Sequence, residues 1–126
     1  MSSLRITAPA VALILTALTG FAAQQAQAHA HLKSQYPAAG ATMSAAPQAL
    51  TMTFSQGIDP AASGLALTGP GNVPIPTGVI KADPANPAHI IIPIDKPLTA
   101  GVYQVQWHAV SVDGHTTEGR YHFSVK

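Results

Sequence analysis

The stretch that decides the fold is residues 101–126, "GVYQVQWHAVSVDGHTTEGRYHFSVK". Every second residue is apolar from Tyr103 to Ala109, and the same alternation returns from Tyr121 to Val125. A period of two, carried by aromatic and β-branched residues, is typical of strands with one buried face. The stretch therefore predicts two strands joined by the polar segment between them.

The same alternation recurs upstream in shorter runs. "LTMTF" at residues 50–54, "GLALTGPG" at 64–71 and "HIIIPI" at 89–94 each suit a short strand. Clusters rich in Pro and Gly, such as "GPGNVPIP" at 69–76 and "ADPANPAH" at 82–89, separate the runs as turns and loops. No mature segment has a helical period. Short strands at roughly even spacing predict an all-β sandwich or barrel.

The first residues have the layout of a secretory signal. Arg5 precedes an apolar run over residues 8–23, and "AQA" at 26–28 places small residues at the cleavage positions. The glutamine-rich stretch leaves the run short of the roughly 20 apolar residues that a membrane-spanning helix needs. We therefore expect removal of residues 1–28, which leaves 29–126 as a single exported domain.

Composition excludes several kinds of partner and of chemistry. The chain has six Lys and Arg against five Asp and Glu, and loss of a leader containing Arg5 would balance the two signs. Such a domain offers no basic groove for nucleic acid and no polybasic patch for a membrane surface. The chain has no cysteine, so any metal must be held by nitrogen and oxygen donors, with methionine as the remaining sulfur donor.

Cleavage after Ala28 would make His29 the first residue of the mature protein. Its free amine and its imidazole could then bind one ion together and close a chelate ring. The amine has a pKa near ~8, so a metal must displace a proton from it at neutral pH. Cu(II) has the highest affinity for such donors among the common divalent ions and favours tetragonal sets of nitrogen and oxygen.

A second pair of donors lies in "SVDGHTTEG", residues 111–119. Asp113 and His115 are two residues apart, and Gly114 between them lets the backbone bend. If the segment were extended, both side chains would point the same way. With His29 they would form a Cu(II) set of one amine, two imidazoles and one carboxylate. On its own the tripeptide is weak evidence, because Asp-Gly is a common turn pair and a histidine in a loop is usually solvated.

The two ends of the mature chain resemble the CopC family of periplasmic copper-binding proteins, and most closely its short, YobA-like branch. The resemblance rests on "HAHLKSQYPAAGATMSAAPQALTMTFSQGI" (29–58) and "PLTAGVYQVQWHAVSVDGHTTEGRYHFSV" (97–125). It implies a Greek-key β-sandwich of the cupredoxin-like or immunoglobulin-like kind. It also implies a histidine brace, in which one Cu(II) per chain is held by His29 through amine and imidazole, by Asp113 and by His115.

The resemblance further implies a monomer in the periplasm that sequesters or carries copper for homeostasis or resistance. Its expected partner is a CopD-type inner-membrane protein. No enzymatic activity is expected. Protonation of His29 and His115 should release the metal as the pH falls, because both must be deprotonated to bind it.

Two positions depart from the family pattern. Some members carry Glu after the "FS" of the second strand, where this chain has Gln56, a neutral amide that could support the site but could not help to neutralise the ion. Some members also have a methionine-rich loop for Cu(I), whereas Met43 and Met52 are not clustered here. We therefore expect no dedicated Cu(I) site. Trp107 is expected in the core, beneath the copper site.

Other arrangements of the histidines remain open. With His29 first, "HAH" also suits chelation by the amine, two deprotonated amides and the imidazole of His31, a mode that needs a flexible terminus. If a strand begins at Leu32, His31 instead lies beside the metal or on the surface. The three remaining histidines are expected on the surface: His89, His108 and His122.

Two other functions use the same residues differently. A histidine-brace copper oxygenase also begins with a copper-binding His, but this chain is small for one, and Asp113 would fill the position that oxygen needs. A metal-free β-sandwich assembly module would instead tolerate substitution of His29, Asp113 and His115.

Overall fold

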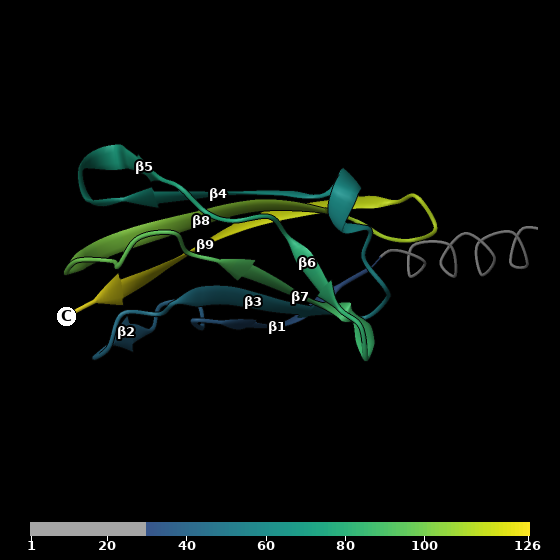
Figure 1. Cartoon of the computed structure of the whole chain (residues 1–126), viewed down its shortest axis with the longest axis horizontal. Helices are drawn as coiled ribbons and strands as arrows, with labels where there is room; N and C mark the ends of the chain where they lie inside the picture. The colour runs from purple at the N-terminus through teal and green to yellow at the C-terminus, as the bar shows by residue number, and fades with distance from the viewer. Residues whose placement is uncertain (1–29) are drawn as a thin grey trace, which may run out of the picture.

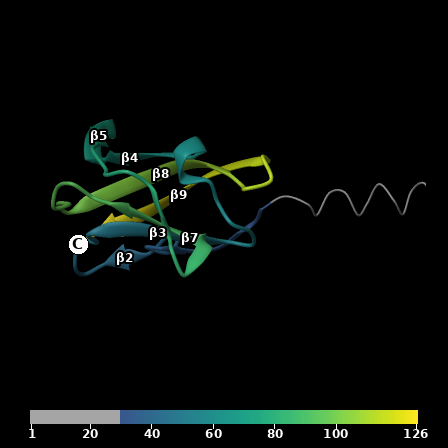
Figure 2. The same ribbon diagram turned by 45° about the vertical axis from the view of Figure 1, so that its right-hand side comes forward.

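The alternating segments of the sequence form the strands of two stacked β-sheets in a computed structural model of the chain (Figure 1). The structure describes residues 30–126. The expected signal peptide, residues 1–28, and the expected copper ligand His29 lie outside the described residues. The all-β sandwich that the sequence predicts is confirmed, and Figure 2 shows the two layers from a second direction.

The first sheet has four strands in the order β1-β3-β7-β6. They are β1 (Leu32–Tyr36), β3 (Ala49–Phe54), β7 (Asn86–Pro93) and β6 (Lys81–Asp83). All neighbouring strands in this sheet are antiparallel.

The second sheet has five strands in the order β2-β9-β8-β4-β5. They are β2 (Thr42–Met43), β9 (Thr116–Val125), β8 (Gly101–Val110), β4 (Gly64–Gly69) and β5 (Val73–Ile75). The short β2 runs parallel to β9, and the other pairs are antiparallel. The chain crosses between the two sheets several times, and this interleaving joins the layers into one sandwich.

Two short 3₁₀ turns flank β4. They are η2 (Pro60–Ala62) and η3 (Pro70–Asn72). Asp59 caps η2, where its side chain accepts a hydrogen bond from the Ala61 amide at 3.1 Å. Within residues 30–126 there is no helix with the length and apolar character needed to cross a bilayer.

The core lies between the sheets and is built from the inward residues of each alternating run. Phe54 packs edge-on against Trp107, with ring centroids 5.4 Å apart, and Tyr103 stacks on Phe123 at the same separation. Aromatic pairs in these geometries add to the stabilisation from area burial. The buried residues that the alternation predicts are Leu50, Met52, Phe54, Leu67, Tyr103, Val105, Trp107, Ala109, Tyr121, Phe123 and Val125.

The last strand is longer than the sequence suggests. The pattern predicts a start near Gly119, but β9 begins at Thr116 and pairs with β8 as far as Val110. Gly119 lies opposite Trp107, and a Cβ added at Gly119 would be 2.7 Å from the indole ring. The glycine that looks like a strand boundary is therefore an interior position that makes room for the tryptophan ring.

Three segments meet at one end of the sandwich. The His31 amide donates to the Ser55 hydroxyl at 2.8 Å, and the Ser55 amide donates back to the His31 carbonyl at 2.8 Å. Two residues further on, the Gly57 carbonyl accepts from the Val112 amide at 3.0 Å. Figure 1 shows the start of the described chain and the β8–β9 loop at this same end, opposite the C-terminus.

Candidate metal centre

The β8–β9 loop is a tight polar turn that begins at a buried serine. The Gly114 amide donates to the Ser111 carbonyl at 2.8 Å, and the Ser111 amide donates to the His115 carbonyl at 2.9 Å. Gly114 has a φ of +92°, a region that favours glycine. Asp113 and His115 are thus brought together by a turn, and not by an extended segment.

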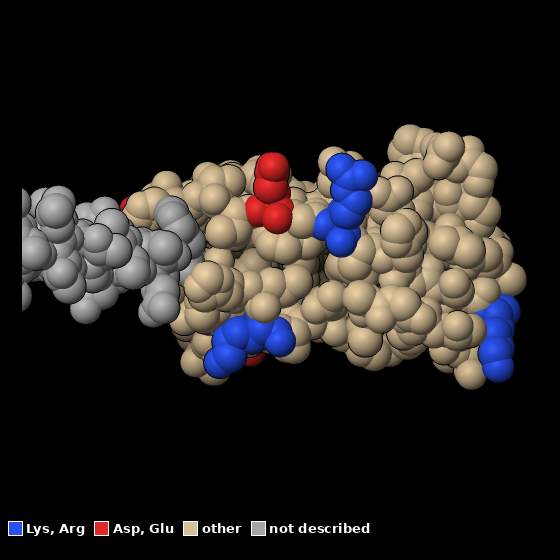
Figure 3. Space-filling view, turned by 180° about the vertical axis from the view of Figure 1, so that it is seen from behind, with Lys and Arg blue, Asp and Glu red and all other residues tan. Residues whose placement is uncertain are grey.

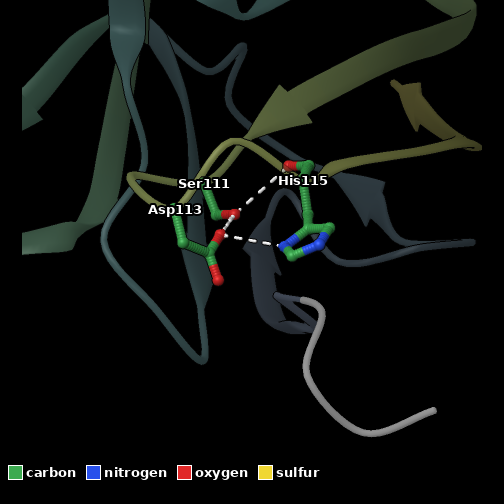
Figure 4. A network of polar contacts seen from close by, with 3 residues as sticks. All are labelled: Ser111, Asp113 and His115. Atoms are coloured by element: carbon green, nitrogen blue, oxygen red, sulfur yellow. Dashed lines mark hydrogen bonds and ion pairs between the residues drawn. The ribbon is translucent and has the colours of Figure 1, made fainter. Parts of the chain in front are cut away.

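Asp113 and His115 face each other across this turn (Figure 4). The His115 Nδ1 lies 3.3 Å from the Asp113 Oδ1, and the two side chains are 47% and 43% exposed. The prediction that this spacing brings a carboxylate and an imidazole together is confirmed.

The Asp113 carboxylate is held in its ionised form. The Ser111 hydroxyl donates to Oδ1, and this hydrogen bond is the main cause that lowers the pKa of Asp113. Partial desolvation acts in the opposite direction, and the neighbouring His115 lowers the pKa further. A carboxylate with a lowered pKa offers a metal a negative charge without first losing a proton.

The pair is not a complete metal site by itself. Within residues 30–126, no group of three or more His, Cys, Asp or Glu side chains gathers in one place. A four-coordinate ion at Asp113 and His115 would therefore need ligands from water or from outside the described residues. His29, the remaining expected ligand, lies outside the described residues.

His31 is held by its backbone at the edge of this region. Its side chain is exposed, and its amide donates to Ser55. Chelation by the first three residues would require that amide to lose its proton, and the preceding Ala30 is only 1% exposed. The strand that was expected from Leu32 is confirmed, so the terminus is anchored from His31 onward and the fold opposes that mode.

Gln56 and Trp107 support the region in different ways. Gln56 is half-buried. It lies between Ser55, which is hydrogen-bonded to His31, and Gly57, which is hydrogen-bonded to Val112. Trp107 is 9% exposed and packs in the core against Phe54, the residue that directly precedes Ser55. The expected core position of Trp107 is confirmed, and a metal role for Gln56 stays a prediction.

The other histidines lie away from this pair. His108 and His122 are exposed on the outer face of the second sheet, as predicted. His89 differs from the prediction of a plain surface histidine. It is half-buried inside β7, and its Nδ1 lies 2.8 Å from the Thr53 hydroxyl because β3 and β7 pair these two residues directly.

Ser111 is the residue of this loop whose contacts the sequence did not predict. It is 1% exposed and is the only Ser, Thr, Asn, Gln or charged residue that is buried within residues 30–126. The sequence does indicate that Ser111 is buried, because Ser111 is two residues after Ala109 and so continues the alternation of inward-facing residues that begins at Tyr103. A serine at an inward position has a hydroxyl that must find a partner.

Comparison with known proteins agrees with the fold. The CopC domain family matches residues 32–126, which is most of the chain. The chain belongs to the CopC family. It is 50% identical over 99 residues to Protein YobA of Escherichia coli strain K12, an alignment that covers 79% of this chain and 80% of YobA. It is 38% identical over 107 residues to copper resistance protein C of Escherichia coli, covering 80% and 84% of the two chains.

Solved structures of the CopC family have the same sandwich. PcoC, a methionine-rich copper resistance protein from Escherichia coli, matches with a TM-score of 0.69 and 38% identity over 79% of this chain and 100% of PcoC. CopC from Methylosinus trichosporium OB3b matches with a TM-score of 0.72 and 26% identity over 78% of this chain and 94% of that one. CopC copper resistance proteins bind copper and are not enzymes, so the family does not support the oxygenase hypothesis.

The two methionines within residues 30–126 of this CopC-family chain do not form a cluster like that expected of a methionine-rich relative. Met52 is 1% exposed in the core of the first sheet, as predicted, whereas Met43 is half-buried on β2 of the second sheet. The two thioethers therefore belong to different layers.

Proposed function

We propose that the mature protein begins at His29 and holds one Cu(II) ion in the periplasm. The ligands would be the amine and imidazole of His29, the carboxylate of Asp113 and the imidazole of His115. The observation that carries the proposal is the exposed Asp113–His115 pair, with its 3.3 Å separation, at the end of the sandwich where the described chain begins.

The donor types favour Cu(II). Three nitrogens and one carboxylate oxygen suit the tetragonal geometry of Cu(II), and the chain has no thiolate to select a softer ion. The ionised Asp113 supplies a negative charge that helps to neutralise the ion.

The family supports a role in copper homeostasis or resistance rather than in catalysis. A monomeric carrier would keep copper from free redox chemistry and would deliver it to, or receive it from, a CopD-type inner-membrane protein. The surface has little charge to attract a polyanion, and in the face shown in Figure 3 charged side chains are few and scattered.

A competition titration with a chromogenic Cu(II) chelator tests this proposal. The protein that begins at His29 is compared with its Asp113→Ala/His115→Ala variant and with a matched His108→Ala/His122→Ala control. The ligand variant should lose more than about 100-fold in Cu(II) affinity, beyond what loss of an outer contact costs. The control should bind like the parent. Equal affinity in the parent and the ligand variant would overturn the proposal and favour the metal-free module.

A further inference from the structure

Ser111 touches the candidate site at several points of the loop. Its hydroxyl lies between the Asp113 Oδ1, to which it donates, and the His115 carbonyl oxygen at 3.2 Å. Its own amide also donates to the His115 carbonyl, and its carbonyl accepts from the Gly114 amide. One buried residue therefore contacts both expected ligands of the loop and the glycine between them.

Ser111 is also tied to the rigid part of the sandwich. It forms a β-bridge with Ile58, which is 2% exposed in the core, and the next residue, Val112, is bonded to Gly57. The loop ligands are themselves nearly half exposed and lack a packed environment of their own. Any order in the Asp113 side chain must therefore come through the few contacts that reach it from the core.

We propose that Ser111 is a positioning residue for copper: its buried hydroxyl holds Asp113 Oδ1 so that the other carboxylate oxygen, Oδ2, is presented to the ion. This inference rests on the proposed function, because it assigns a task to Ser111 at the same site. A carboxylate on an exposed turn would otherwise sample several rotamers. A ligand held in its binding rotamer loses less conformational freedom when the ion arrives.

The chain offers a matched control for this contact. The Ser63 hydroxyl accepts from the Val110 amide at 3.0 Å and donates to the Asp59 carbonyl at 2.8 Å. Ser63 thus supports β8 at Val110, one residue before Ser111, through hydrogen bonds to Val110 and Asp59 and not to Asp113. A role in general loop stability would be shared by both serines, whereas positioning of a ligand would be specific to Ser111.

The test is a mutant cycle in the protein that begins at His29. The variants are Ser111→Ala, Asp113→Ala, the Ser111→Ala/Asp113→Ala double variant, and Ser63→Ala. Cu(II) affinity is measured by chelator competition, the coordination geometry by electron paramagnetic resonance, and the stability of each metal-free protein by thermal unfolding. The unfolding curves show whether each variant is folded before copper is added.

Ser111→Ala should lower Cu(II) affinity by about 10–100-fold, the usual effect of losing a contact that orients a ligand. It should also change the resonance spectrum. In the Asp113→Ala background the same change should have an effect below about twofold, because Ser111 acts through Asp113. Ser63→Ala should leave affinity and spectrum unchanged, even if it lowers the unfolding temperature as much as Ser111→Ala does.

The outcomes separate this inference from the proposed function. If Asp113→Ala weakens copper binding but Ser111→Ala does not, or if Ser63→Ala weakens it equally, the positioning role is wrong and the copper site stands. If Ser111→Ala weakens binding equally with and without Asp113, the hydroxyl does not act through the carboxylate. If Asp113→Ala has no effect, the copper site itself is wrong.

Discussion

The β8–β9 hairpin contains two regions that are built in different ways. Its ladder runs from the pair Gly101–Val125 to the pair Val110–Thr116 and buries one face of each strand in the core. Its loop, residues 111–115, is exposed apart from Ser111 and is held by a few polar contacts. Stability therefore resides in the ladder and the expected chemistry in the loop, so substitutions in the two regions should have separable effects.

The largest effect should come from removal of a core ring in the ladder. Phe123 is 1% exposed and stacks on Tyr103, so Phe123→Ala should cost about 3–5 kcal/mol of unfolding free energy, measured by denaturant titration. The control is Val102→Ala, since Val102 lies on the outer face of the same ladder and is 58% exposed. Equal effects of the two substitutions would contradict the assignment of the core face.

A change of pH should affect Cu(II) binding at the loop more than it affects the stability of the ladder. Affinity for Cu(II) should fall as the pH falls from neutral, roughly tenfold per pH unit for each nitrogen donor that takes up a proton. The pKa of Asp113 is lowered, so its carboxylate stays ionised over this range, and any stability that it adds is lost only in stronger acid. Chelator competition at several pH values measures the slope. An affinity that stays flat from neutral to mildly acidic pH would argue against imidazole and amine ligands.

Two glycines, one in the ladder and one in the loop, should each be sensitive to substitution by alanine, but for different physical reasons. A Cβ at Gly119 would be 2.7 Å from the Trp107 ring, so Gly119→Ala should cost about 1–3 kcal/mol through overpacking. Gly114 has nothing within 4 Å of such a Cβ, but its φ is +92°, so Gly114→Ala should cost about 1–2 kcal/mol through backbone strain.

The two variants should differ in copper binding. Gly114→Ala alters the turn that joins Asp113 to His115 and should weaken Cu(II) binding. Gly119→Ala should leave the affinity of the folded protein unchanged. The comparison fails if Gly119→Ala is the variant that weakens copper binding.

The smallest effect concerns a buried hydroxyl in the ladder. Tyr121 is 6% exposed, and its hydroxyl has no hydrogen-bond partner among residues 30–126, whereas the Tyr103 hydroxyl donates to the Thr99 carbonyl at 2.7 Å. Tyr121→Phe should therefore change stability at neutral pH by less than about 1 kcal/mol, and Tyr103→Phe should cost about 0.5–1.5 kcal/mol.

The burial of Tyr121 should affect the unfolding free energy at alkaline pH. Burial raises its pKa to about 12, so the folded state keeps the phenol proton where an unfolded tyrosine, with a pKa near ~10, has lost it. Unfolding free energy should thus fall between those two pH values, and part of that fall should be absent in Tyr121→Phe. Identical alkaline profiles for the parent and the variant would show that Tyr121 is not buried as described.

The contrast also explains what the sequence could and could not predict. The buried faces of β3, β8 and β9 follow from alternation, because a strand with one buried face leaves a period of two. The short strands β2, β5 and β6 were not predicted, since two or three residues are too few to show a period. Their pairing depends on neighbours that are distant in sequence.

The candidate site was predicted in part for the same reason. Asp113 and His115 are close in sequence, so their spacing was informative. The partner of His89 was not predictable, because Thr53 is 36 residues away and meets it only through the β3–β7 register. The contribution of Ser111 depends on burial, which the sequence indicates only through the phase of the strand.

The central claim is that copper joins the first mature residue to the β8–β9 loop. The most direct test is electron paramagnetic resonance of the Cu(II) protein that begins at His29, beside the same protein with one glycine added before His29 and beside the Asp113→Ala/His115→Ala variant. The account predicts that the extension and the loop substitutions each weaken binding and each change the spectrum. If only the extension has an effect, copper is bound by the "HAH" terminus alone, and the proposed site between the terminus and the loop is wrong.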